Sequence, residues 1–173
     1  GMTEVGVTSV ELSPKVENRL KGSIGRPLEG ITYKIDPTDE KVSGVNLGEL
    51  LIKSNITHVR EIIGGVEKEP ELEEGFLRSG DIVFRDASGN FYVKGRIKDI
   101  IINANGENVY PDEIESYFKS IPHVSNTCVV GIRKGKSTDE TITLILEVDN
   151  KISTEEYVSL KDKVQEINVG LAN

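Results

Sequence analysis

The sequence predicts an α+β fold, in which an antiparallel β-barrel-like subdomain is followed by a small mixed α/β domain. In the first half, short alternating apolar stretches are separated by turns rich in Gly, Asp and Asn, which is typical of antiparallel strands. From residue 98 onward, strand-like stretches and apolar residues at helical spacing follow the order strand, helix, strand, strand, helix. We therefore expect one domain over residues 1–97 and a second over residues 98–173.

Turn-forming residues separate the expected strands of the first half. Asp36–Glu40 predicts a turn between the first two strands, and Asp86–Asn90 is typical of a hairpin turn. Residues 1–21 indicate an irregular loop, and the acidic run Glu67–Glu74 indicates a solvated loop. The strands themselves are expected at residues 28–35, 47–53, 82–85 and 91–94.

A strand, a tight turn and the start of a helix follow one another after residue 98. Ile100–Ile102 is an apolar β-branched run, as expected for a covered strand. Asn105-Gly106 favours a tight turn with positive φ, and Pro111 suits the first position of a helix. The expected helix carries apolar residues at i, i+3, i+4 and i+7, which are Ile114, Tyr117, Phe118 and Ile121.

Two further strands and a second helix complete the expected small domain. Residues 124–132 predict a strand, and residues 141–148 alternate between an apolar and a mostly polar face. Cys128 lies in an apolar run, so we expect a buried structural thiol. Ser153 and Glu156 have the spacing of a capping box. The helix that they begin has an apolar face made of Tyr157, Leu160, Val164 and Ile167.

The composition is that of a globular protein, with 29% charged and 36% hydrophobic residues in a chain of 173. No apolar run approaches the roughly 20 residues that a transmembrane helix needs. The sequence has no charged-then-apolar leader, so we expect a cytoplasmic protein without a transmembrane segment. A single cysteine excludes an intramolecular disulfide.

Charge and histidine placement exclude some classes of partner. A formal net charge of −8 without any Lys- or Arg-rich run argues against nucleic acid, although backbone amides and local cations can still hold a nucleotide phosphate. His58 and His123 lack the spacing of metal ligands, so we expect both at surface or turn positions. Gly131–Ser137 is similar to a phosphate-binding loop but is one residue short and joins two expected strands, so we expect a hairpin.

Residues 95–115 carry the most specific pattern of the chain. A strand ends at Gly95, charged residues follow at Arg96, Lys98 and Asp99, and the buried strand, tight turn and helix start come next. This segment resembles the signature of the adenylate-forming (AMP-binding) superfamily of acyl-CoA synthetases. Segments that resemble four other motifs of this family occur in the same order, at Gly1–Glu4, Gly22–Pro27, Gly48–Leu50 and Arg78–Asp81.

The resemblance implies a reaction and a set of nucleotide contacts. In that family a carboxylate is joined to AMP with release of pyrophosphate, and the acyl group then passes to a thiol. Thr3 matches the residue that contacts the AMP phosphate, Asp81 matches the carboxylate that binds the ribose hydroxyls, and Arg96 matches an arginine that contacts the nucleotide. Glu4 matches the Mg²⁺ ligand, and a hard oxygen donor suits that ion. We therefore expect a small carboxylic acid, ATP or AMP, Mg²⁺ and CoA.

Two more positions match the moving parts of the family. Lys98 matches the hinge about which the small domain rotates between the two half-reactions. Gly106 lies in the thiol-tunnel loop and would allow close approach of the pantetheine arm. The variant at Asn105–Glu115 is most similar to the long-chain fatty acyl-CoA synthetase branch, so we expect a fatty-acid substrate. His58–Glu69 departs from the family, because it stands where an aromatic stretch is usual.

Several parts of the family pattern have no counterpart here, so we expect an excised C-terminal fragment. The glycine-rich phosphate loop and the acyl pocket are absent, and the adenylation lysine is expected beyond Asn173. We expect the fragment alone to be inactive and able to dimerise through surfaces that the cut exposes. Gly1 fits either a tag remnant or a native residue. An enzyme that loads a carrier protein and a non-catalytic module of the same fold stay open as alternatives.

Overall fold

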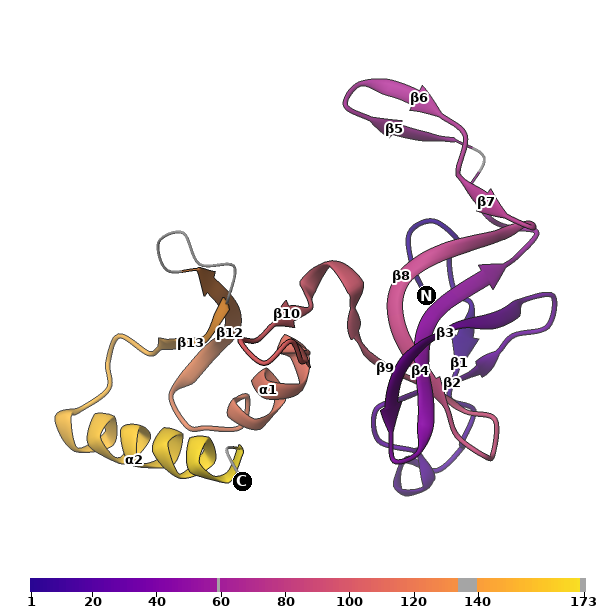
Figure 1. Ribbon diagram of the computed structural model, residues 1–173. Coiled ribbons are helices and arrows are strands. Elements are labelled where there is room, and N and C mark those ends of the chain that lie inside the picture. Colours follow the sequence, from indigo (N-terminus) through magenta and orange to yellow (C-terminus); the bar gives the residue numbers. More distant parts are fainter. Residues whose placement is uncertain (59, 134–139, 172–173) are drawn as a thin grey trace. The chain divides into compact units, whose positions relative to one another are not determined.

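The computed structural model describes residues 1–58, 60–133 and 140–171. The chain folds as two compact units, Gly1–Lys98 and Asp99–Asn173 (Figure 1). Most of the described elements are strands, and the two α-helices both belong to the second unit. Within the described residues, no helix combines the length and the apolar character needed to cross a bilayer.

The first unit is built around one antiparallel sheet of seven strands. These strands are β1 (Ser9–Val10), β2 (Ser23–Pro27), β3 (Thr32–Val42), β4 (Val45–Lys53), β7 (Leu72–Glu73), β8 (Phe76–Arg85) and β9 (Phe91–Arg96). Their order is β1-β2-β9-β8-β4-β3, and β7 pairs with β8. The unit also contains the 3-10 turn η1 (Val16–Asn18) and a separate hairpin of β5 (Glu61–Ile63) and β6 (Val66–Lys68).

The sheet is open, so the prediction of a barrel-like subdomain is wrong. The strands β1 and β3 stand at the two ends of the strand order, and among the described residues no pairing joins them. Closure of a barrel needs a continuous ladder between the two end strands. With two residues, β1 offers too short a ladder for this.

The β3–β4 hairpin turns at Ser43-Gly44 and not at the predicted Asp36–Glu40. Ser43 and Gly44 have φ angles of 48° and 81°, which is typical of a two-residue type I′ turn. Asp36–Glu40 lies inside β3, where the register shifts after Pro37. Proline cannot donate to a ladder, so at this position it marks an irregularity within the strand.

Of the other predictions for turns and loops in the first unit, one is confirmed and one is partly wrong. The β8–β9 hairpin turns at Asp86–Asn90, as predicted. Hydrogen bonds from the side chain and backbone of Asn90 lower the pKa of Asp86. The solvated loop predicted over Glu67–Glu74 is partly wrong, because β6 and β7 take residues from it. Gly64 and Gly65, with φ of 60° and 81°, form the turn that allows β5 and β6 to pair.

The core of the first unit lies around β4, an interior strand between β8 and β3. Its residues Leu50 and Ile52 are 3% and 2% exposed, as expected for a strand with neighbours on both sides. The ring of Phe91 on β9 meets that of Tyr33 edge-on, with centroids 5.1 Å apart. The buried cluster consists of Val5, Leu50, Ile52, Leu77, Val83 and Phe91.

The second unit follows the predicted order with one strand added. Its elements are β10 (Ile101–Ile102), β11 (Asn108–Val109), α1 (Pro111–Phe118), β12 (Val124–Arg133), β13 (Glu140–Val148) and α2 (Thr154–Leu171). The added strand, β11, pairs with β10 across the predicted turn at Asn105-Gly106. The strands β12 and β13 pair antiparallel. Part of the segment that resembles a phosphate-binding loop, Gly131–Ser137, lies outside the described residues.

The predicted capping box of α2 is confirmed. Ser153 donates its backbone N–H to Glu156 Oε2 at 2.8 Å, and Ser153 Oγ accepts the N–H of Glu156 at 3.2 Å. The bond from the Ser153 backbone holds the pKa of Glu156 below its usual value. Together these bonds satisfy donors at the helix start, which otherwise have no partner.

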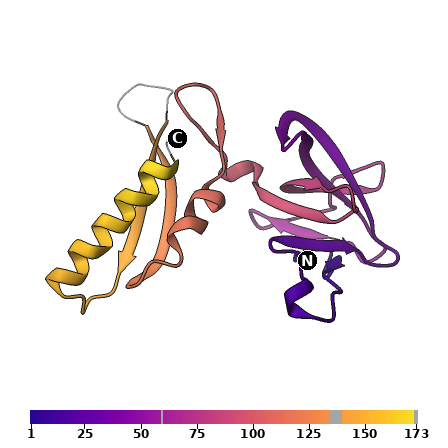
Figure 2. The same ribbon diagram turned by 90° about the horizontal axis from the view of Figure 1, so that it is seen from below.

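Helix α2 packs along the β12–β13 pair (Figure 2), and both predicted helical faces contribute to the second core. Phe118 is fully buried, and Ile121 and Leu160 pack with it. Tyr157 is 48% exposed, so it does not belong to this core.

Cys128 on β12 is exposed, and the prediction of a buried thiol is wrong. Side chains alternate along β12, and the neighbouring Val129 takes the inward position.

Replacing Phe118 by alanine should destabilise the second unit by roughly 3–5 kcal/mol, because the ring leaves a cavity in a core that cannot fully collapse. The matched control is Tyr117→Ala, since Tyr117 is 49% exposed. Urea unfolding, followed through amide NMR signals of residues 111–171, measures both. Equal losses for the two variants would contradict the assignment of Phe118 to the core.

Candidate nucleotide-binding site

Asp81 and Arg96 lie opposite each other on the neighbouring strands β8 and β9. Arg96 Nε donates to Asp81 Oδ1 at 2.9 Å, and the two side chains are 44% and 22% exposed. Two residues that are separate in the sequence and were both predicted to contact one nucleotide are therefore direct neighbours. A carboxylate has about four lone-pair sites, so the bond to Arg96 leaves capacity for further donors.

An irregularity in β8 places Asp81 at this position. Glu49 pairs with Ile82 and Leu51 pairs with Arg78, so one β4 residue stands opposite the three residues 79–81. Gly80 has a φ of 73°, a backbone conformation that favours glycine. We define this bulge as Ser79–Asp81. Two of its N–H groups bond to side chains: that of Gly80 to Glu49 Oε1 at 3.1 Å and that of Asp81 to Ser79 Oγ at 3.0 Å.

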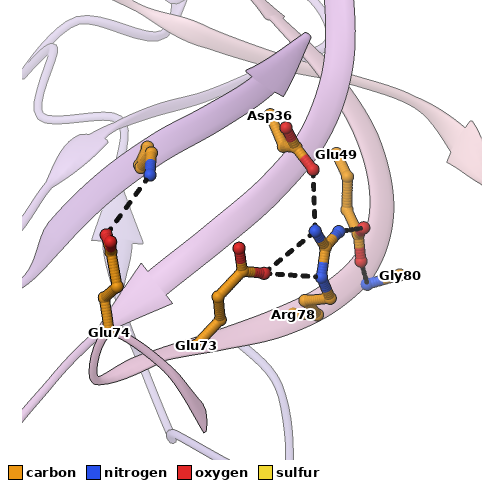
Figure 3. Close-up of polar contacts among 7 residues, drawn as sticks. Asp36, Glu49, Glu73, Glu74, Arg78 and Gly80 are labelled. Carbon is orange, nitrogen blue, oxygen red and sulfur yellow. Dashed lines mark hydrogen bonds and ion pairs between the residues drawn. The ribbon is translucent and has the colours of Figure 1, made fainter. Parts of the chain in front are cut away.

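Arg78, directly before the bulge, is surrounded by three carboxylates (Figure 3). Its Nη2 lies 2.8 Å from Asp36 Oδ2 and 3.0 Å from Glu73 Oε2, its Nε lies 3.1 Å from Glu73 Oε2, and its Nη1 contacts Glu49 Oε2. The hydrogen bond with Asp36, followed by the hydrogen bond with Glu49 and the charge of Glu49, raises the pKa of Arg78 further above its usual value. No role for these carboxylates was predicted from the sequence, although Glu49 lies in Gly48–Leu50, one of the segments that resemble family motifs.

Thr3 and Glu4 lie in a short turn that the bridge between Met2 and Gly6 closes. Thr3 is exposed and Glu4 is half-buried. The carbonyl oxygen of Glu4 accepts the backbone N–H of His58 at 2.8 Å, and His58 Nδ1 lies 3.2 Å from the same oxygen. The side chain of His58 is 19% exposed, so this residue is half-buried in an irregular segment and not fully at the surface.

Glu4 also lines a cleft of about 400 Å³ in the first unit. His58, Arg78 and Ser79 contribute to the same cleft, whereas Thr3, Asp81 and Arg96 do not line it. Among the described residues, no group of three or more His, Cys, Asp or Glu could hold a metal ion. A lone carboxylate still fits Mg²⁺, because this ion is usually held by one or two carboxylates together with water and substrate phosphates.

The two residues predicted to move lie in exposed turns. Lys98 is an exposed residue of the 3-10 turn η2 (Ile97–Asp99) and ends the first unit. Gly106 belongs to the second unit, has a φ of 79°, and has no heavy atom within 4 Å of the position that a Cβ would take. Asn103 Oδ1 accepts the N–H groups of Asn105 and Glu107, both at 2.9 Å, and so orders this turn.

Similarity to individual known proteins identifies the family, although no protein-family model matches the chain. It is 33% identical over 141 residues to the long-chain-fatty-acid–CoA ligase FadD13 of Mycobacterium tuberculosis, a match that covers 81% of this chain and 28% of that protein. It is 31% identical over 160 residues to the 2-succinylbenzoate–CoA ligase of Bacillus pumilus, which covers 92% of this chain and 32% of that protein.

Solved structures give the same result. The O-succinylbenzoate coenzyme A synthetase MenE of Bacillus subtilis, in complex with ATP and magnesium, matches with a TM-score of 0.68 and 29% identity, over 92% of this chain and 33% of that one. The ATP-bound chimera RpMatB-BxBclM matches with a TM-score of 0.65 and 27% identity, over 96% of this chain and 33% of that one.

The chain thus spans about a third of the length of these relatives or less. The matches extend over most of its own residues, and each curated relative named above is a CoA ligase. The chain belongs to the adenylate-forming, AMP-binding superfamily of acyl- and aryl-CoA ligases.

Proposed function

We propose that this chain supplies the nucleotide-gripping part of an ATP-dependent CoA ligase. The observation that carries the proposal is the cross-strand pair of Asp81 and Arg96, with Nε and Oδ1 2.9 Å apart at an exposed position. A carboxylate beside a guanidinium offers acceptors for the ribose hydroxyls and a cation for the negatively charged nucleotide. The solved relatives in complex with ATP and magnesium, or with ATP, support a nucleotide as the ligand.

In the complete ligase, an oxygen of the substrate carboxylate would attack the α-phosphorus of ATP and pyrophosphate would leave. The thiol sulfur of CoA would then attack the acyl carbon of the adenylate and AMP would leave. Asp81 would hold the ribose and Arg96 the nucleotide in both steps, while the Thr3 hydroxyl donates to a phosphate oxygen. Glu4 would hold Mg²⁺, which neutralises phosphate charge when bound.

Lys98 and Gly106 would serve the change between the two steps. We propose residues 1–97 as the C-terminal β subdomain of the large domain and residues 98–173 as the small mobile domain. An exposed lysine keeps its charge solvated in more than one backbone state, which suits a hinge. The open space around Gly106 suits the approach of the pantetheine arm of CoA.

The substrate of the complete ligase would be a carboxylic acid. The names of the relatives include ligases of long-chain fatty acids, 2-succinylbenzoate and sulfoacetate. These substrates share an ionisable acid group and differ in the rest of the molecule. The signature at Asn105–Glu115 supports a fatty acid as the narrower proposal.

The ribose contact can be tested with AMP and its 2′,3′-dideoxy analogue. The chain should bind AMP about tenfold or more tightly than the analogue, because hydrogen bonds to a charged group contribute about 1.5–3 kcal/mol each. In Asp81→Asn this preference should fall to about threefold or less, since the amide forms weaker bonds. Isothermal titration of both variants with both nucleotides measures the ratio.

Asp81→Asn is a fair test because an exposed ion pair contributes only about 0.2–1 kcal/mol to stability, so the variant should stay folded. An unchanged preference for AMP in Asp81→Asn would contradict the ribose contact. Failure of the unmodified chain to bind AMP would contradict the proposed function itself.

The bulge can be tested with a pair of glycine variants. Gly80 and Gly44 both have positive φ, 73° and 81°, and both have open space where a Cβ would stand. Alanine at either position should cost about 1–2 kcal/mol through backbone strain alone. Only Gly80→Ala should also weaken AMP binding, because Gly44 lies in the β3–β4 turn. Equal AMP affinities in the two variants, measured by the same titration, would sink the proposed role of the bulge.

A further inference from the structure

Glu49 is a mostly buried carboxylate that makes two bonds to the segment before Asp81. Its side chain is 13% exposed. Oε1 accepts the N–H of Gly80 at 3.1 Å, and Oε2 contacts Nη1 of Arg78. Figure 3 shows both bonds, which join β4 to the start of the bulge on β8. A carboxylate with this burial needs such partners, since an unpaired one would be costly.

The bond to Gly80 solves a problem that the bulge creates. One residue, Leu50, stands opposite three on β8, so the backbone groups of the bulge cannot all pair in the ladder. A backbone N–H needs an acceptor, and Glu49 supplies one for Gly80. The next N–H, that of Asp81, bonds to Ser79 Oγ. Two consecutive amides are thus fixed by side chains immediately before the Asp81 carboxylate.

Arg78 fixes the orientation of Glu49 in turn. Its guanidinium is a planar fork, and Asp36 and Glu73 hold the edges that Glu49 does not occupy. A fork held on three sides has little freedom to rotate. The preceding residue, Gly48, allows β3 to come close, because a Cβ there would lie 2.3 Å from the carbonyl oxygen of Asp36.

We propose that Glu49 is a positioning residue for the nucleotide: its carboxylate holds the Gly80 amide and so keeps Asp81 opposite Arg96. The inference rests on the proposed function, because it assigns a purpose to the position of Asp81. It predicts that the reach of the side chain matters more than its charge. A glutamine keeps an oxygen at the right distance for Gly80 but turns its NH2 group toward Arg78 Nη1, so Arg78 loses this one acceptor and keeps its bonds to Asp36 and Glu73. An aspartate keeps the charge but withdraws it by one methylene.

The test compares Glu49→Gln with Glu49→Asp in the 173-residue chain. In Glu49→Asp, the Gly80 amide should exchange with solvent about tenfold faster or more, and AMP should lose about tenfold of its advantage over the dideoxy analogue. In Glu49→Gln, both quantities should stay within about threefold of the unmodified chain. A role of the charge alone predicts the reverse order. Hydrogen exchange by NMR reads Gly80, with the core amide of Val83 as the internal reference for global opening.

Asp36→Asn and Glu73→Gln are the matched controls, since each removes charge from Arg78 without touching Gly80. Both should leave Gly80 exchange and the nucleotide ratio within about threefold. If Glu49→Asp retains slow Gly80 exchange or the full preference for AMP, the positioning role is overturned. If the unmodified chain does not bind AMP, the proposed function fails and so does the nucleotide role of Glu49. In that case, Gly80 exchange still shows whether the carboxylate holds the bulge.

Discussion

Backbone N–H groups in the β8 bulge need hydrogen-bond acceptors, and the arrangement of the candidate site depends on how this need is met. A regular ladder between β4 and β8 would pair these groups with β4, whereas here one β4 residue stands opposite residues 79–81. Side-chain oxygens of Glu49 and Ser79 accept the N–H groups of Gly80 and Asp81 instead, and Asp81 pairs with Arg96 on the other neighbouring strand, β9. We infer that the bonds which stabilise this part of β8 also help to place the Asp81 carboxylate.

The two arginines of this region differ in what they can do. Every nitrogen of the Arg78 guanidinium already faces a carboxylate, and breaking such a network leaves charges unpaired. Arg96 contacts Asp81 with its side chain 44% exposed, where an ion pair is weak and easily remodelled. In the proposed complex, a nucleotide would join or rearrange the pair of Asp81 and Arg96 at little cost. Arg78 is thus suited to hold structure, and Arg96 to bind a ligand.

Local sequence patterns predicted the helices, the α2 cap and the β8–β9 hairpin, because each depends on residues close in the sequence. They failed where distant residues decide. Asp36–Glu40 has turn composition, yet pairing with β4 keeps it within β3. The exposure of Cys128 depends on which face of β12 is covered, and the open sheet depends on the length of β1. Glu49 was visible only as part of a motif, because its bond to Gly80 spans 31 positions.

The central claim is that Asp81 and Arg96 hold the same nucleotide, and a structure of the chain with AMP tests it most directly. The account predicts both ribose hydroxyls within about 2.5–3.0 Å of the Asp81 carboxylate oxygens and the Arg96 guanidinium in contact with the same AMP. AMP bound away from β8 and β9, with Asp81 paired to Arg96 alone, would contradict it.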